Sequence, residues 1–438
     1  MTTALRTPLP SPLDASTGQS HLHWLDGLRY GLMGLPLAFV ALPLYVVLPN
    51  YYARNFALPM ATVGALLLGA RLLDAVIDPL LGRWSDRLYR AGGHAVLRWG
   101  AVAAIALAAG FALLFSPQVE GADALLLWVL GSLVLTYTAY SALTILHQAW
   151  GAMLGQDDAQ RGRVVAWREG CGLAGVVTAS LLPFALGMGG SATVFAVMLA
   201  AAWWAWSQAP RPPGPSQISA RAQPGGASLY LPWRRAPFRG LMAVFMVNGI
   251  ASAIPATLLL FFVQDRLQAP ADWQPAFLGI YFLSAALALP LWTRVVPQWG
   301  LAPTWGVGML LSVAVFAFAA QLSAGDAAAF MVVCALSGAA LGTDLALPAA
   351  LLAKVIAQSG DSGSAEGAYF GWWNFATKLN LALAAGLTLP ALQALGYTPG
   401  AQSGAALQAL TMAYCMLPCA LKLLAAALLY RFITRETP

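Results

Sequence analysis

The stretch RLLDAVIDPLLGRWSD, residues 71–86, places charged side chains inside and at the edge of an otherwise apolar helix. Arg71, Asp74 and Asp78 are separated by three and four residues, so one face of that helix carries all three. A charge near the centre of a bilayer costs roughly 2.5–3.5 kcal/mol on insertion scales, so ionisable groups at that depth usually mark the route of an ion, a proton or a solute. This charged face therefore predicts one buried functional site.

The composition of the whole chain is that of a polytopic membrane protein. Of its 438 residues, 59% are hydrophobic and 9% are charged, and the mean hydropathy is +0.69. Soluble domains average about 25% charged residues, and a membrane span needs about 20 apolar residues. We expect an all-α protein with twelve such spans, near residues 30–52, 60–82, 97–115, 124–151, 164–186, 190–207, 238–263, 274–294, 301–321, 327–353, 366–391 and 406–431.

A polar segment rich in Pro, Gly and Ser divides these spans six and six. Two pseudo-symmetric six-helix bundles with a substrate site between them, near the midplane of the bilayer, are a known transporter plan. The expected parts are a cytoplasmic tail at 1–29, an N-terminal bundle at 30–207, a cytoplasmic linker at 208–237, a C-terminal bundle at 238–431 and a cytoplasmic tail at 432–438.

The distribution of basic residues predicts the orientation in the membrane. Only Arg54 and Arg266 fall in loops on the side opposite to the two tails, so both termini are expected in the cytoplasm of a multi-pass inner-membrane protein. The first two dozen residues lack the pattern of a cleaved signal peptide. The excess of basic residues in the cytoplasmic loops also explains the net charge of +6. We therefore expect no nucleic-acid partner.

Cofactors are not expected apart from a coupling cation, H⁺ or Na⁺. No GxxxxGK[ST] stretch is present for nucleotide binding. The four cysteines lie in predicted spans without the histidines of a metal site, so no metal is expected beyond sodium at Asp74 and Asp78. An enzyme would need a convergent set of nucleophile, base or metal ligands, which the spans do not offer.

The loop after the second predicted span, GRWSDRLYR, resembles the GxxxDRxxR signature of the major facilitator superfamily. Gly82, Asp86, Arg87 and Arg90 carry the match. In that superfamily the aspartate and the arginines form an ion-pair gate between helices, so the resemblance implies a gating role for these four residues. A carboxylate can also engage the partial charge of a helix end.

The longer pattern R-x-x-D-A-x-x-D-P-x-x-G, residues 71–82, more specifically resembles the glycoside–pentoside–hexuronide:cation symporter family. Further matches follow in order between about residues 30 and 390. They are Tyr140-Ser141, Gly151-Ala152, Asp157, Arg161, Arg168, Pro348, Glu366-Gly367 and Lys378. The resemblance implies the major facilitator fold, and we add Arg71 and Arg161 to the expected gating residues, Arg71 as the group that orients the acids.

In that family, the two acids that match Asp74 and Asp78 bind the coupling sodium or proton. The residue that matches Ser141 supplies a ligand oxygen, and the lysine that matches Lys378 neutralises the acids once the cation has left. Hard cations prefer carboxylate and hydroxyl oxygens, and two carboxylates this close repel each other, which favours binding of a proton.

Several positions depart from the family pattern. Its sugar-binding aspartate on the first span falls on Ala38, its aspartate on the fourth span on Thr144, and its stacking aromatic on Gln148. These changes argue against the family's usual sugar recognition. Thr144 in the cation site also leaves less negative charge, which favours protons over sodium. Lys354 and Ala357 stand where the family has acids, so the ion pairs of the cytoplasmic gate must differ from those of the family.

Substrate contacts are expected on several predicted spans. Arg168 matches a substrate-site position, and a guanidinium binds a carboxylate or phosphate in a bidentate manner. Asp344 has two open readings, because it can pair with Lys378 or Lys422, or line the cavity and bind substrate. The other candidate contacts are Tyr140, Gln148, Trp373 and Asn374.

The expected function is secondary active transport: cation-coupled symport of a small solute by alternating access, by a protein that works as a monomer in the lipid bilayer. One alternative is transport of a lysolipid or another amphipathic molecule, which predicts a cavity open laterally to the bilayer. A different class, a sensor with a transporter fold, predicts ligand binding without ion flux.

Overall fold

The computed structural model describes residues 23–48, 51–52, 56, 60–212, 228–270, 272–398, 400 and 403–436. All regular structure within these ranges is helical, without strands, which confirms the predicted all-α class. Most of the predicted N-terminal tail, residues 213–227 of the predicted linker and the last two residues of the chain lie outside the described residues.

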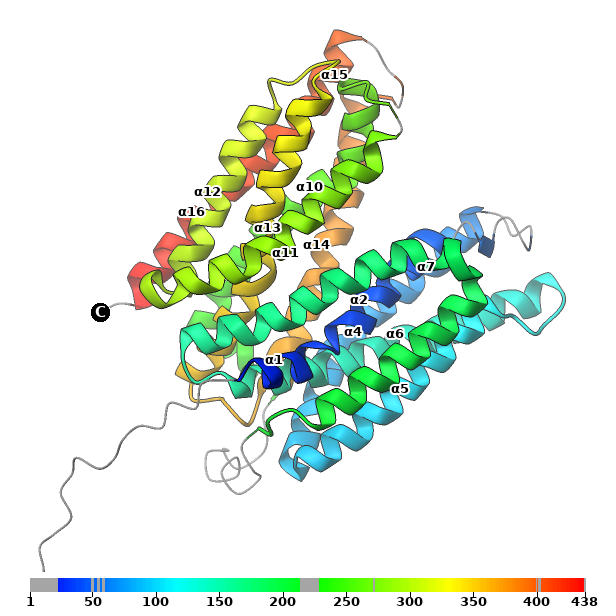
Figure 1. Ribbon diagram of the computed structural model, residues 1–438, viewed down its shortest axis with the longest axis vertical. Helices are drawn as coiled ribbons and strands as arrows, with labels where there is room; N and C mark the ends of the chain where they lie inside the picture. Colours follow the sequence, from blue (N-terminus) through cyan, green and yellow to red (C-terminus); the bar gives the residue numbers. More distant parts are fainter. Residues whose placement is uncertain are drawn as a thin grey trace, which may run out of the picture.

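The first half of the chain forms one helical bundle, coloured blue to green in Figure 1. Its elements are α1 (Trp24–Gly31), α2 (Gly34–Leu42), the π-helix η1 (Pro43–Val47), α4 (Met60–Ala91), α5 (Gly93–Phe115), α6 (Ala122–Leu154) and α7 (Asp158–Ser207). Residues 24–29 of the predicted tail are therefore helical: the His23 side chain caps α1, and Gly27 and Gly31 pack against Trp167.

The second half forms the other bundle, and long apolar helices again make up most of it. Its elements are α9 (Leu231–Arg234), α10 (Ala236–Phe261), η2 (Phe262–Arg266), α11 (Trp273–Trp299), α12 (Leu301–Ala319), α13 (Ala327–Gln358), α14 (Glu366–Ala394), α15 (Gly404–Thr411), η3 (Met412–Met416) and α16 (Leu417–Glu436).

Each of the twelve predicted spans overlaps helix in the residues that the structure describes; residues 49 and 50 of the first span lie outside them. Among the described residues, nine helical segments are long and apolar enough to cross a membrane. The other three predicted spans fall on α2 with η1, on α4 and on the first part of α7. Arg71, Asp74 and Asp78 lower the hydropathy of α4, and these are the residues that suggested a buried site.

The fifth and sixth spans are joined within α7 by a single residue. Gly187 has φ 67° and ψ −179°, a conformation that is essentially restricted to glycine. The helix therefore turns back at this point, as the predicted break between residues 186 and 190 requires. Asp157 caps the start of α7 by accepting a hydrogen bond from the Gln160 amide at 2.7 Å.

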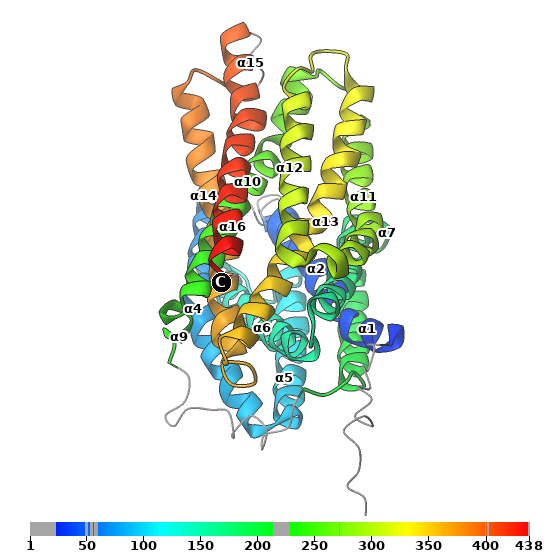
Figure 2. The same ribbon diagram turned by 90° about the vertical axis from the view of Figure 1, so that its left-hand side faces the viewer.

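The two bundles meet at one end and diverge at the other, as Figure 1 shows. Figure 2 looks onto the end where they meet. We call the end where they meet the arginine-rich end. It carries the loops at residues 92, 155–157, 208–212, 300 and 359–365. Most of the arginines expected in loops lie instead at the helix ends beside them, because α4 continues to Ala91 and α7 begins at Asp158. The opposite end, which carries α15, is called the α15 end.

Buried apolar side chains form two clusters that follow this arrangement. The larger cluster runs through the first half and continues across the arginine-rich end into the second half, through Leu347, Leu351 and Tyr369. The smaller cluster lies in the second half toward the α15 end and includes Phe330 and Tyr414. The halves thus share a hydrophobic core where they meet.

Glycines bring α4 and α14 into backbone contact at this junction. A Cβ atom on Gly82 would collide with the Gly367 carbonyl, and one on Gly371 would lie 2.6 Å from the Asp78 carbonyl oxygen. Gly367, Gly371 and Lys378 are spaced by four and seven residues, so they share one face of α14. That face is pressed against the acidic face of α4.

Candidate functional site

Four polar side chains from three helices meet in what we call the coupling cluster: Asp74 and Asp78 of α4, Ser141 of α6 and Lys378 of α14. The Lys378 Nζ lies 2.5 Å from an Asp74 carboxylate oxygen and 2.7 Å from an Asp78 carboxylate oxygen. It also donates to the Ser141 hydroxyl at 2.8 Å, and that hydroxyl donates to Asp74 at 2.7 Å. The structure therefore brings together four of the five predicted coupling residues in direct contact.

The coupling cluster is buried and has unequal charges. Asp74 is 5% exposed and Asp78 is 0% exposed, whereas the Lys378 side chain is 20% exposed. Two ionised carboxylates and one ammonium leave one formal negative charge. Burying charges is costly unless they are paired, so this site favours a small cation, and its carboxylate and hydroxyl oxygens are the ligands that sodium or a proton would use.

The local sequence explains why the acids face α14. Asp74 and Asp78 are one helical turn apart, so their side chains lie above one another on α4. Pro79 follows directly and has no amide hydrogen to donate to the Ala75 carbonyl, which weakens the helix at the level of the site. Gly371 lets the α14 backbone approach at the same level. Lys378 is seven residues further along α14, on the same face.

Arg71 lies outside the coupling cluster. Its side chain is exposed, and it interacts with Tyr137 of α6. Lys378 contacts both carboxylates directly. The role of Arg71 in orienting the acids stays a prediction.

A row of polar residues on α6 continues from the coupling cluster. Ser141, Thr144 and Gln148 follow at intervals of three and four residues and are all buried. The Asn374 side-chain amide of α14 donates to the Gln148 oxygen at 2.8 Å, which is a second direct contact between the halves. Trp373 instead stacks on Phe245 of α10, with ring centroids 3.7 Å apart, and so packs within the second half.

Arg168 lies near the same row, on α7. Its guanidinium pairs with the neighbouring Glu169 at 2.6 Å and interacts with Tyr140. Arg168, Gln148 and Arg161 line a narrow gap of about 10 Å³ together with Phe370 from the second half. This gap has room for about one water, so Arg168 and Gln148 line no solute-sized space here in this conformation.

The predicted gate at Asp86 has a partner that differs from the expected arginine. The Asp86 carboxylate accepts hydrogen bonds from the backbone amides of Gly367 at 2.6 Å and Ala368 at 3.0 Å, at the start of α14. A carboxylate at a helix N-terminus is stabilised by the amides and the helix dipole. Arg87 and Arg90 are exposed, and the Arg90 Nε contacts the Asp86 backbone carbonyl at 3.4 Å.

A second charged contact closes the arginine-rich end. Lys354 of α13 pairs with Asp158 of α7 at 2.7 Å, and Arg161 approaches the same carboxylate at 3.4 Å. Lys354 was recognised as a departure from the family pattern, but Asp158 was missed. It belongs to none of the matched motifs, and its partner is 196 residues away in the chain.

Asp344 lies in the second half and is paired there. Its carboxylate contacts the Lys422 Nζ at 2.7 Å, which decides between the two lysines considered as ion-pair partners. It also accepts from the Trp305 indole at 2.8 Å, the Asn248 amide at 3.0 Å and the Ser252 hydroxyl at 3.1 Å. These last three residues were not predicted, because isolated polar residues on separate spans show no common spacing.

A family model described as MFS/sugar transport protein matches residues 29–435 of the chain. The chain belongs to this family. Members of this family are transporters of the major facilitator superfamily and not enzymes, and the predicted fold class and family resemblance are confirmed.

Two curated Escherichia coli K12 proteins are similar to parts of this MFS chain. "Putative glycoside/cation symporter YagG" is 29% identical over 147 residues, which cover 33% of this chain and 31% of YagG. "Inner membrane symporter YicJ" is 26% identical over 262 residues, which cover 55% of each protein. The chain thus matches about a third of the length of one relative and about half of the other.

Solved structures share the fold of this MFS transporter at low sequence identity. A bacterial homologue of the iron transporter ferroportin in an outward-facing state has a TM-score of 0.68 and 14% identity, over 94% of this chain and 100% of that chain. A variant of the E. coli fucose:proton symporter FucP has a TM-score of 0.66 and 13% identity, over 92% and 98% of the two chains. The proton:xylose symporter XylE has a TM-score of 0.64 and 14% identity, over 94% of both.

Proposed function

We propose that this protein is a cation-coupled symporter that moves a small solute by alternating access. The observation that carries the proposal is the coupling cluster, in which Lys378 of one half occupies the carboxylates of the other half at 2.5 and 2.7 Å. An intramembrane charge cluster of this kind is typical of ion pathways. YagG and YicJ both carry the word symporter in their names, which supports the same class of function.

Lys378 acts in this proposal as a tethered cation. When no coupling ion is bound, its ammonium neutralises the acids and ties α14 to α4. A bound cation takes its place, so Lys378 leaves the carboxylates and one tie between the halves is lost. Because ion binding and the contact between the halves use the same carboxylates, ion binding changes the relative stability of the closed and open states.

We propose a proton as the coupling ion. Thr144, one turn from Ser141 on α6, contributes a neutral hydroxyl where the resembling family has a carboxylate, so the site holds fewer negative ligands for sodium. The coupling residues proposed are Asp74, Asp78, Ser141, Thr144 and Lys378.

Glycosides are the first solute class to test, because YagG carries that name. Gln148 and Asn374 offer amide groups, and Arg168 a guanidinium, in place of the acids that the resembling family uses for sugars. Hydroxyl groups of a solute can pair with any of these donors and acceptors. Tyr140 lies near Arg168, and we include it among the proposed contacts.

We propose that the arginine-rich end faces the cytoplasm of the inner membrane, because arginines gather at the helix ends there. The contacts at Asp86, Lys354 and Gln148 then close the cytoplasmic side, and the divergence toward the α15 end in Figure 1 corresponds to an outward-facing state. The protein would work as a monomer, with the rocking of one bundle against the other exposing the site to each side in turn.

Replacing Gly82 by alanine is expected to loosen the cytoplasmic closure. The new Cβ collides with the Gly367 carbonyl, and overpacking costs about 1–3 kcal/mol. This corresponds to a change of roughly five- to 140-fold in the equilibrium between the closed and open states. The readout is the rate at which a membrane-impermeant maleimide, added from the cytoplasmic side, labels an Ala353→Cys reporter beside the closed gap. Gly69→Ala on the same helix is the control, because nothing lies within 4 Å of its new Cβ. Equal labelling in both variants would contradict this account.

Asp158→Asn is expected to have a smaller effect in the same direction. The side chains of Lys354 and Asp158 are 31% and 25% exposed, and partly exposed ion pairs contribute about 0.2–1 kcal/mol. Labelling of the same reporter should rise by up to about fivefold. Asp123→Asn, an exposed position on α6, should leave the rate unchanged; a rise there of the same size would show that the change in surface charge, and not the contact, is responsible.

The proposed function is tested directly by reconstitution in liposomes. Internal pH and internal sodium are recorded while glycosides and then other small polar solutes are added outside. The proposal predicts uptake of at least one solute accompanied by proton entry. Solute uptake that needs sodium instead would correct the coupling ion, and uptake independent of both cations would overturn symport.

A further inference from the structure

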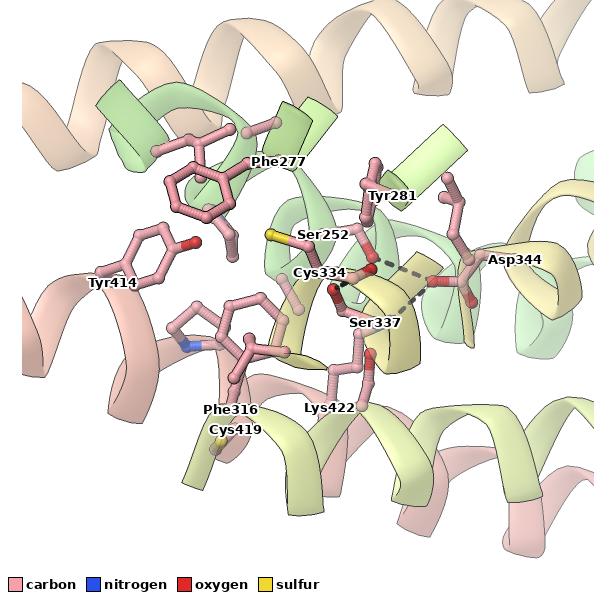
Figure 3. A pocket seen from close by; sticks show the side chains of 18 of the residues that line it. Ser252, Phe277, Tyr281, Phe316, Cys334, Ser337, Asp344, Tyr414, Cys419 and Lys422 are labelled. Carbon is pink, nitrogen blue, oxygen red and sulfur yellow. Dashed lines mark hydrogen bonds and ion pairs between the residues drawn. The ribbon is translucent and has the colours of Figure 1, made fainter. Parts of the chain in front are cut away.

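The second half contains a cavity of about 280 Å³ that is separate from the coupling cluster. Its walls come from α10, α11, α12, α13 and α16 with η3, and Figure 3 shows the lining side chains. Small-molecule sites in proteins have volumes of about 300–1,000 Å³, so this space is of the right order for a small ligand.

One part of the wall is apolar and aromatic. Phe277, Phe316 and Tyr414 line it, together with Cys334 and Cys419. In Figure 3 the rings of Phe277 and Tyr414 lie on the opposite side of the cavity from Asp344. Aromatic and aliphatic walls bind an apolar body by removing its surface from water.

The other part of the wall is polar and built around a buried ion pair. Lys422 and Asp344 both line the cavity and lie 2.7 Å apart. A lysine ammonium has three donors. In the part of the chain that the structure describes, two of them reach Asp344 and, at 3.0 Å, Asn248. The third remains for a ligand, and the hydroxyl oxygens of Ser252 and Ser337 nearby can still accept.

The charge of this polar end determines what it can recognise. Asp344 neutralises Lys422, so the pair offers a charge-assisted donor without a net charge. A neutral acceptor such as a hydroxyl or a carbonyl fits this arrangement. A carboxylate or an ammonium would bring an uncompensated charge into an apolar cavity, which is costly.

All lining residues lie between 251 and 422, within one half of the chain. When two bundles rock against each other as rigid bodies, a site between them is exposed alternately, but a site inside one bundle moves with that bundle. A ligand held here therefore travels with the second half and is not carried across by the rocking.

We propose that this cavity binds a small neutral amphiphile, with an aromatic or branched aliphatic body against the Phe277–Tyr414 side and a hydroxyl or carbonyl group on Lys422. The ligand is a modulator and not cargo, because it ties α10, α11, α13 and α16 together within one bundle. This site shares no residue with the coupling cluster, so the ligand proposal can be tested separately from the proposed symport.

The native cysteines provide the test. The purified full-length protein in nanodiscs is treated with N-ethylmaleimide, and the modification rate of each cysteine is measured by mass spectrometry. Cys334 lines the cavity, whereas Cys171 lies on α7 in the other half. We expect 2-naphthol to slow the labelling of Cys334 in a saturable manner and to leave Cys171 unchanged.

Two comparisons make this test specific. 2-Methylnaphthalene lacks the hydroxyl acceptor. Its concentration in the bilayer should have to be about tenfold higher for the same protection of Cys334, which corresponds to a loss of ~1.4 kcal/mol in binding free energy. Ala256→Phe, at an exposed lining position of α10, should abolish protection, whereas Leu260→Phe, exposed on the same helix but outside the cavity lining, should retain it.

Several results would overturn the proposal. Equal effects of 2-naphthol on Cys334 and Cys171 would show bulk partitioning only. Equal potency of the two naphthalenes would remove the role assigned to Lys422. Labelling of Cys334 that varies with the acyl-chain length of the bilayer but not with 2-naphthol would mean that a lipid chain fills the cavity.

Discussion

Asp78→Asn is expected to reduce cation-driven solute uptake by about a hundredfold or more. Asp78 is fully buried and lies 2.7 Å from Lys378. Removing one member of a buried charged pair typically costs about 3–5 kcal/mol, and each 1.4 kcal/mol is a factor of ten. In the variant, Lys378 and Asp74 form a neutral pair, so the attraction for a further cation is lost. The measurement is solute accumulation with simultaneous recording of internal pH in proteoliposomes.

The control for this prediction is the same chemical change away from the site. Asp123→Asn removes a carboxylate from an exposed position near the start of α6, in the same half of the protein, and is expected to transport at the wild-type rate. Both variants must elute as the wild type does on size exclusion, so that loss of fold is not mistaken for loss of coupling. Unaltered uptake by correctly folded Asp78→Asn protein would remove the acid pair from the mechanism.

Lys378→Gln is expected to separate net uptake from exchange. Without the ammonium, an empty carrier must pass through its closed state with two carboxylates and no counter-charge. An uncompensated buried charge costs about 3–5 kcal/mol, so the return step should slow by a factor of about a hundred or more. Exchange of labelled for unlabelled solute uses only the loaded carrier and should persist. The measurement compares the two rates in the same liposomes.

Lys378→Arg is the matched variant for this prediction, because it keeps the positive charge but not the shape of the ammonium. Partial recovery of net uptake is expected. A Lys378→Gln protein that loses exchange and net uptake equally would contradict the role of a tethered counter-charge, and one that keeps both would show that the lysine is structural.

The main features of the fold were predictable from local properties of the chain. Span length and hydropathy located the helices, and the break at Gly187 followed from the end of one apolar run and the start of another. Asp74 and Asp78 were predictable because an i, i+4 pair of acids in a span is visible in one segment. Lys378 was placed beside them by family resemblance and not by spacing.

Contacts between distant spans were not predictable in this way. Asp158 and Lys354 are 196 residues apart, and Asn374 and Gln148 are 226 apart. Side chains this far apart carry no shared periodicity. Their pairing depends on how the bundles are tilted, which the glycine contacts between α4 and α14 help to set. The partner of Asp86 also depends on the tilt of the bundles. The backbone amides at the start of α14 bind its carboxylate, where an arginine was expected.

The cavity in the second half illustrates the same limit. Asp344 and Lys422 stood out as charges at membrane depth, but an apolar wall looks like ordinary helix packing in the sequence. Phe277, Phe316 and Tyr414 lie on separate elements, and only the arrangement of these elements leaves space between them. Because several helices together leave this space, the sequence of any one helix does not predict it.

The central claim is that the coupling ion and Lys378 compete for Asp74 and Asp78. Proton and sodium binding by the purified protein in nanodiscs tests it most directly, with the wild type, Lys378→Gln and Asp78→Asn titrated side by side. Competition predicts that Lys378→Gln binds the cation at least about tenfold more tightly than the wild type and that Asp78→Asn loses binding. Equal affinity in wild type and Lys378→Gln would contradict the claim.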